Sequence, residues 1–186
     1  NYPVAGGHLA RTGFYLVANS DGQPGMVTLV ALVNILQPRL SPLTAALGWG
    51  PLFVVVLYAG LVLVLRELFG RHKWEAFALL VFLFPVGFKI HEIRGSIAGF
   101  VLLTWTLLFV LRLLRTGARL DLAGAVVTLA AAWNFGQLGA LYFFALLGVW
   151  MLAEVVTGQR TRAVALMRVL FWTNVIEWSH LLVAFR

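Results

Sequence analysis

Cysteine and charged residues are what this sequence has least of. The 186-residue chain contains no cysteine, which excludes disulfides and thiolate metal sites and leaves the redox compartment unassigned. Charged residues make up 11% of the chain, against about 25% in an average soluble domain. Hydrophobic residues make up 61%, and a soluble chain this apolar would expose large apolar patches and aggregate. The composition therefore predicts an integral membrane protein, because a surface that faces lipid has to be apolar.

Six apolar stretches predict membrane-spanning helices, so the expected fold class is an all-α, polytopic transmembrane helix bundle. They are 43–65, 74–88, 95–111, 120–133, 135–153 and 163–185. The second and fourth are shorter than the roughly 20 residues of a straight span, which snorkelling Arg and Lys side chains or longer helices would accommodate. A seventh stretch, 25–36, is too short to cross and predicts a juxtamembrane helix. We therefore expect an extracytoplasmic and juxtamembrane segment, 1–42, and a helical bundle, 43–186.

The basic residues predict how the bundle is oriented. Nine of the fourteen fall on one side of the predicted spans: eight in the loops that contain Arg66, Arg112 and Arg160, and Arg168 close by. The positive-inside rule places that side in the cytoplasm, so the net charge of +7 indicates orientation and not nucleic-acid binding. The expected location is the plasma membrane of a bacterium or archaeon, with the lipid bilayer as the surrounding partner.

The loop at 88–95 is the densest charged segment between two apolar runs. As a functional site it would use Glu92 as an acid, base or metal ligand, with Lys89 and Arg94 binding a phosphate and His91 beside them. Arginine presents a planar fork that matches phosphate oxygens, and a lysine adds a point charge. The alternative is a solvated hairpin closed by a Glu92–Arg94 ion pair.

Two ionisable residues fall in the last predicted span. Glu177 and His180 are spaced i, i+3 and should share one face of the helix. Ionisable groups inside a span are often functional, and these two can pair with each other, ligate a metal or support a site entrance. One His and one Glu do not predict a metal site. His180 as an axial ligand of a chlorin or haem is the less favoured alternative, so the cofactor stays unknown.

Smaller signals fall elsewhere in the chain. Asp21 lies in a run of turn-forming residues, 19–25, where it is either an acidic site residue or part of a plain turn in which it caps the amino terminus of the next helix. Small residues permit close helix packing, which is the expected role of Gly95, Gly99, Gly124 and Gly148. The tryptophans of the predicted spans are expected to be interfacial or packing residues.

Several stretches resemble the GT-C superfamily, the polytopic glycosyltransferases that use polyprenyl-phosphate sugars. LARTGFY at 9–15 and QPGMVTL at 23–29 are similar to a small-residue helix and a Pro-containing juxtamembrane segment of that family. RELFGR at 66–71 resembles the end of a family helix on the cytoplasmic side. Ile93-Arg94-Gly95 leads through an apolar stretch to the basic link at 111–117. This order is similar to a part of the family in which an outer arginine is followed by a span and a short basic cytoplasmic link.

The resemblance implies an integral membrane glycosyltransferase that transfers a sugar from a lipid-phosphate donor on the extracytoplasmic side. Asp21 and Glu92 would be its acidic catalytic residues. The residues implied in substrate binding are Lys89, His91, Arg94, Glu177 and His180. The first span of the family and the acidic residue after it have no counterpart here, and the chain starts without Met. Two expectations follow: the chain is a piece of a longer protein with the principal carboxylate upstream, or it is a degenerate or non-catalytic relative of the family.

A different function class fits the same composition. A bundle of six helices with few polar side chains would suit a non-enzymatic accessory or scaffold subunit of a respiratory or photosynthetic membrane complex, with further membrane subunits as partners. A transporter is less favoured, because the sequence shows no internal repeat or pair of broken helices of the kind found in transporter folds.

Overall fold

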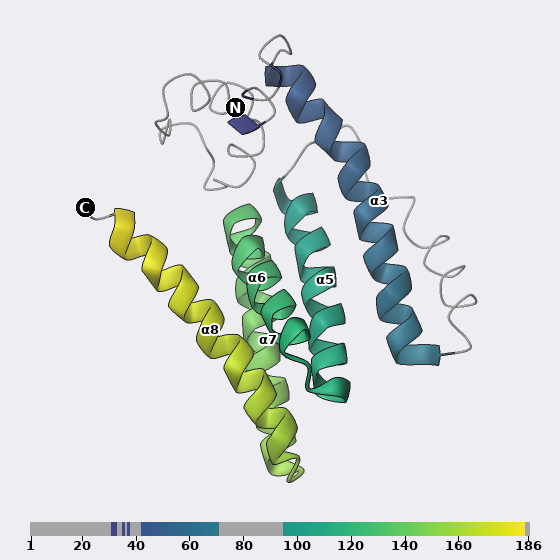
Figure 1. Cartoon of the computed structure of the whole chain (residues 1–186), viewed down its shortest axis with the longest axis vertical. Coiled ribbons are helices and arrows are strands. Elements are labelled where there is room, and N and C mark those ends of the chain that lie inside the picture. Colours follow the sequence, from purple (N-terminus) through teal and green to yellow (C-terminus); the bar gives the residue numbers. More distant parts are fainter. Residues whose placement is uncertain (1–30, 33–34, 36, 38–41, 71–94, 185–186) are drawn as a thin grey trace.

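The computed structural model describes residues 42–70 and 95–184, together with 31, 32, 35 and 37 (Figure 1). Within these residues the chain forms helices and no strand, which confirms the predicted all-α class. The long helices are α3 (Pro42–Phe69), α5 (Gly95–Thr116), α6 (Arg119–Phe135), α7 (Gln137–Val156) and α8 (Arg160–Ala184). Of the juxtamembrane helix predicted at 25–36, the described residues Ala31, Leu32 and Ile35 are helical.

The helices continue past the predicted apolar stretches, mainly at the arginine-rich end. α3 runs to Phe69 and α5 to Thr116, beyond the predicted ends at 65 and 111. α8 begins at Arg160, three residues before the predicted start. Arginine and leucine are good helix formers, so the helix continues where the apolar stretch ends. The predicted start of the fifth span at 135 is wrong, because Phe135 ends α6 and α7 begins after Gly136.

Successive described helices alternate in direction from α5 to α8, with α3 beside α5 at one side of the bundle (Figure 1). The carboxyl-terminal ends of α3 and α5 lie together, because Glu67 contacts Arg115. α3 and α5 therefore run parallel, so the end of α3 and the start of α5 lie at opposite ends of the bundle. The span predicted at 74–88 falls between these two helices in the sequence and lies outside the described residues.

Among the described residues, two helices contain a stretch long and apolar enough to cross a membrane: Ala98–Thr116 in α5 and Gln137–Val156 in α7. α6 has 17 residues, which corresponds to a length of about 25 Å. α8, which contains Arg160, Arg162, Arg168 and Glu177, is not one of the two candidate spans. The described helices thus provide two of the six predicted spans by this criterion.

α5 and α6 pack closely because small residues let their backbones approach. A Cβ atom added at Gly124 would lie 2.8 Å from the ring of Phe109. One at Gly99 would lie 3.5 Å from the backbone of Gly136. The buried hydroxyl of Thr106 lies 2.9 Å from that of Thr128 and links the two helices. The packing role predicted for Gly99 and Gly124 is confirmed.

α3 contacts α5 through a tryptophan. The indole N–H of Trp105 donates a hydrogen bond to the carbonyl oxygen of Val56, at 3.2 Å. The absent side chain of Gly60 makes room for this indole, since a Cβ atom there would lie 3.0 Å from its nitrogen. Trp105 is therefore a packing residue, which is one of the two roles expected for it.

Two short turns at the arginine-rich end require a positive φ angle. Gly117 ends α5 with φ 68°, and its N–H donates to the carbonyl of Leu113 at 2.8 Å. Gly158 lies between α7 and α8 with φ 77°. Glycine adopts this left-handed conformation without a steric penalty, so both helices can end sharply and reverse.

The outer faces of α7 and α8 are apolar. In α7, exposed large hydrophobic residues occur from Leu138 to Val156, and Tyr142 and Val149 are each about two-thirds exposed. Gly148 has no atom near its missing Cβ, so the close packing predicted there is wrong. In α8, Phe171, Trp172 and Trp178 are exposed. The buried core instead lies where α5, α6, α7 and α8 meet and includes Val110, Leu129, Leu147, Leu166 and Val169.

Candidate functional site: a basic cavity at one end of the bundle

One end of the described bundle gathers most of its described charged residues. The carboxyl-terminal ends of α3, α5 and α7 and the amino-terminal ends of α6 and α8 all lie there (Figure 1). The arginines at these helix ends are Arg66, Arg112, Arg115, Arg119, Arg160 and Arg162. This is the end that the sequence analysis assigned to the cytoplasm.

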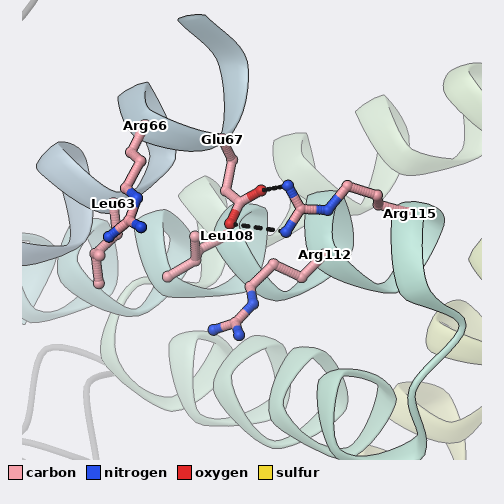
Figure 2. A pocket seen from close by; sticks show the side chains of 6 residues that line it. All are labelled: Leu63, Arg66, Glu67, Leu108, Arg112 and Arg115. Atoms are coloured by element: carbon pink, nitrogen blue, oxygen red, sulfur yellow. Dashed lines mark hydrogen bonds and ion pairs between the residues drawn. The ribbon is translucent and has the colours of Figure 1, made fainter. Parts of the chain in front are cut away.

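A cavity of about 300 Å³ lies between α3 and α5 at this end (Figure 2). Its polar wall carries three guanidinium groups and one carboxylate, and two leucines complete it. The lining residues are Leu63, Arg66, Glu67, Leu108, Arg112 and Arg115. A hollow with this excess of positive charge is suited to an anion.

The carboxylate of the cavity is engaged by one arginine. Nη1 of Arg115 lies 2.7 Å from Oε2 of Glu67, and Nη2 donates to Oε1 at 3.4 Å. Figure 2 shows this two-point contact between the helices, with the guanidinium group of Arg66 lying apart from it. The side chain of Glu67 is 17% exposed and that of Arg115 is 65% exposed. The pair therefore ties α3 to α5 and fixes one side of the cavity.

A second carboxylate, Asp121, lies beside the cavity in the first turn of α6. It is buried, and its Oδ1 atom is 3.7 Å from Nε of Arg112. Its Oδ2 atom is 3.0 Å from the hydroxyl of Thr116, which also accepts a hydrogen bond from the N–H of Ala118. An acidic side chain at a helix amino terminus is favoured by the helix dipole. Asp121 thus organises the turn between α5 and α6.

The third carboxylate at this end belongs to α7. Oε1 of Glu154 accepts a hydrogen bond from the indole of Trp150 at 3.0 Å and lies 4.0 Å from Nη1 of Arg162 in α8. Each of the three described carboxylates at the basic end therefore contacts an arginine of a neighbouring helix. They hold helices together, and none of them faces the cavity as a free base.

This arrangement is not predicted from the sequence. The arginines of the loops serve there as orientation signals, and their partners Glu67, Asp121 and Glu154 become apparent only in the structure. One signal was present: Leu63 and Arg66, like Leu108 and Arg112, are spaced by three or four residues and so share a helix face. The same order of an apolar and then a basic residue occurs on both helices.

Most of the residues predicted for the outer site lie outside the described part of the chain. These are Asp21, Lys89, His91, Glu92 and Arg94. The hypotheses that assign catalytic roles to Asp21 and Glu92, and binding roles to the others, therefore stay predictions.

Glu177 and His180 both lie within α8, so they share a helix face as their spacing predicted. Glu177 is half-buried and follows buried Thr173 by one turn. It lies about 26 Å along α8 from Arg160, toward the end of the bundle opposite the basic cavity. Within the described residues, no group of three or more His, Cys, Asp or Glu side chains is placed to hold a metal ion.

Comparisons with known protein families, curated proteins and solved structures find no match to this chain.

Proposed function

We propose that the chain is a multi-pass integral membrane protein with six spans, of which α3, α5, α6, α7 and α8 are five. The observation that carries this proposal is the surface of α7. Its whole apolar stretch, Gln137–Val156, is long enough to cross a membrane, and only 11% of that stretch is buried within the protein. A surface helix of a soluble protein has a polar outer face.

The exposed side chains of α7 strengthen this argument. Leu138, Leu141, Leu146, Val149 and Leu152 are each more than half exposed. Soluble monomers rarely expose contiguous apolar patches larger than a few hundred Å². Acyl chains would cover such a face without the free-energy penalty that water imposes.

The orientation can be tested with single cysteines, because the natural chain has none. Gln137 and Gln159 are exposed and flank α7 at its two ends. With the basic end in the cytoplasm, a membrane-impermeant maleimide added to intact cells should label Gln137→Cys and not Gln159→Cys. The reverse pattern would overturn the orientation, and labelling of both before cell lysis would overturn the crossing of α7.

For activity, we propose a GT-C-like glycosyltransferase that takes its sugar from a lipid-phosphate donor on the extracytoplasmic side of a bacterial or archaeal plasma membrane. Support comes from the sequence resemblance, together with the proposed orientation, which puts the loop at 89–94 and the far end of α8 outside the cell. In this proposal Lys89 and Arg94 bind the donor phosphate, with His91 beside them. Glu177 and His180 border the same end.

An inverting sugar transfer needs a carboxylate that removes a proton from the acceptor hydroxyl and cations that stabilise the departing phosphate. Glu92 and Asp21 are the acidic residues proposed for the first role, and Arg94 and Lys89 are proposed for the second. Arginine can donate two parallel hydrogen bonds to a phosphate, which lysine cannot reproduce.

The test is sugar transfer from a radiolabelled polyprenyl-phosphate sugar in membranes that contain the protein. Arg94→Ala should abolish transfer, and Arg94→Lys should retain part of it. Arg168→Ala is the matched control, because Arg168 is exposed on α8 near the basic end. Full transfer by Arg94→Ala would overturn the phosphate role.

A second candidate is an accessory subunit of a larger membrane complex. One observation favours it: the described carboxylates Glu67, Asp121 and Glu154 all serve contacts between helices. A wild-type chain that transfers no sugar and leaves mild detergent in a complex of constant composition would support this function over the transferase.

A further inference from the structure

The cavity between α3 and α5 has an apolar inner wall and a basic mouth. Leu63 precedes Arg66 by three residues in α3, and Leu108 precedes Arg112 by four in α5. Leu108 is 2% exposed, whereas both arginines are exposed. The cavity is thus amphipathic along the bundle axis, with its positive charge at the level where the helices end.

Two of the three guanidinium groups have no hydrogen-bond acceptor within the described part of the chain. Arg115 is held by Glu67. Arg112 has its closest carboxylate oxygen 3.7 Å away, beyond hydrogen-bonding distance. Arg66 contacts no carboxylate among the described residues. Each guanidinium group carries five N–H donors in a fork, and both Arg66 and Arg112 line the cavity.

We propose that this cavity binds a phosphate group, with Arg66 and Arg112 as its donors. Three guanidinium groups against Glu67 and Asp121 leave the site with a positive charge. Guanidinium forks match the geometry of phosphate oxygens better than a lysine would. The group belongs either to the headgroup of an anionic phospholipid or to free phosphate.

The leucine wall favours a lipid as the source. A phospholipid would place its phosphate at the two arginines and its glycerol and first methylene groups along Leu63 and Leu108. This alternative rests on the membrane placement proposed above, which puts the basic end beside the anionic cytoplasmic leaflet. Binding of free phosphate does not depend on that placement.

The experiment uses the full chain purified in a neutral detergent. Native mass spectrometry measures retention of phosphatidylglycerol against phosphatidylcholine with the same acyl chains, and calorimetric titration measures binding of inorganic phosphate. Arg66→Gln and Arg112→Gln should each weaken the binding of the retained phosphate compound about fivefold, as expected for one arginine beside an anionic surface. Arg160→Gln is the control, because it removes the same charge at the same end but does not line the cavity.

Preferential retention of phosphatidylglycerol identifies the lipid as the source, and binding of inorganic phosphate identifies the free anion; either supports the site. The proposal is overturned if phosphatidylglycerol is retained no better than phosphatidylcholine and inorganic phosphate does not bind. It is also overturned if Arg160→Gln weakens binding as much as Arg66→Gln does. Thermal melting shows whether each variant is folded, and Arg66→Gln removes no hydrogen bond or ion pair with a described residue. Alkaline carbonate extraction of cell membranes tests membrane placement separately, so failure of the site is distinguishable from failure of the membrane assignment.

Discussion

α5 and α7 have similarly apolar sequences but differ in how much of that apolar surface is buried within the protein. Each contains an apolar stretch of membrane-crossing length, with two charged residues in α5, Arg112 and Arg115, and one in α7, Glu154. In α5, 39% of that stretch is buried, and its side chains meet α3 on one side and α6 on the other. In α7, 11% is buried. Hydropathy therefore identifies both helices but does not distinguish the central one from the outer one.

The polar residues of the two helices show what hydropathy leaves out. α5 carries Thr106, which contacts Thr128 of α6, and Trp105, which donates to the backbone of α3. Between its ends α7 exposes Leu146 and Val149 instead. Without a hydrophobic force between helices in lipid, association depends on close packing and interhelical hydrogen bonds. α5 has both kinds of contact, so it is the helix that organises the described bundle.

The largest expected effect comes from a charge at the centre of the exposed face of α7. Leu146 is the tenth of its twenty residues and is 56% exposed. Leu146→Arg should disfavour membrane insertion of α7 by about 2.5–3.5 kcal/mol, or roughly a hundredfold. The measurement is the inserted fraction of α7 in a glycosylation-mapping assay.

Val156→Arg is the matched control for this change. Val156 ends α7 at the basic end and is 87% exposed, so an arginine there can reach the headgroups. Its insertion should match that of the wild type. Equal insertion of Leu146→Arg and the wild type would show that α7 does not cross the bilayer, and the contrast between α5 and α7 would lose its meaning.

The second prediction compares two glycines: Gly124 of α6, which packs against α5, and Gly148 of α7. Gly124→Ala should destabilise the protein by roughly 1–3 kcal/mol, because the new Cβ atom would lie 2.8 Å from the ring of Phe109. Gly148→Ala should stabilise α7 by about 0.5–1 kcal/mol, since nothing lies near the added atom and alanine favours the helix. Unfolding in mixed detergent micelles measures both.

A third variant checks the mechanism of that effect. Phe109→Leu in the Gly124→Ala background should restore part of the lost stability, because the smaller side chain leaves room for the Cβ atom. Equal stability changes in Gly124→Ala and Gly148→Ala would show that α5 and α6 do not pack as closely as described.

The sequence predicted the helices well and their contacts poorly, for a physical reason. A long apolar run favours a helix from its own residues, so five of the six predicted apolar stretches coincide with the helices α3, α5, α6, α7 and α8. Which small residue meets which large one depends on how two helices are placed in space. Gly124 and Gly148 are alike in sequence context, yet Gly124 faces Phe109 and Gly148 faces open space.

The two candidate sites also differ in how far the sequence predicts them. The outer loop at 88–95 is predicted as a site because charged residues interrupt apolar ones there. Its residues Glu92 and Arg94, like Asp21, lie outside the described residues. The basic cavity did not stand out, because orientation already explained its arginines. Its recognition needs the contact between α3 and α5, which brings Arg66 and Arg112 to one hollow from positions far apart in the sequence.

The third prediction concerns the hydroxyl pair within the core. Thr106→Val removes the contact with Thr128 at nearly constant volume, and should lower the free energy of unfolding by about 0.6 kcal/mol, the average for interhelical hydrogen bonds in membranes. Thr104→Val is the control, because the hydroxyl of Thr104 donates to Phe100 in its own helix. A larger loss for Thr104→Val would contradict the role of the interhelical pair.

The last prediction compares the ion pairs at the ends of the two helices. Glu67 and Arg115 approach to 2.7 Å at the end of α5, whereas Glu154 and Arg162 are 4.0 Å apart at the end of α7. A double-mutant cycle with Glu67→Gln and Arg115→Gln should give a coupling energy of up to about 1 kcal/mol, since Arg115 is largely exposed. The cycle with Glu154→Gln and Arg162→Gln should give a coupling near zero, because a longer contact is screened by water. Both cycles are measured by unfolding in the same micelles and at two salt concentrations. If the coupling of Glu154 and Arg162 were the larger, the two helices would exchange roles at this end, and α7 rather than α5 would be the helix anchored by charge.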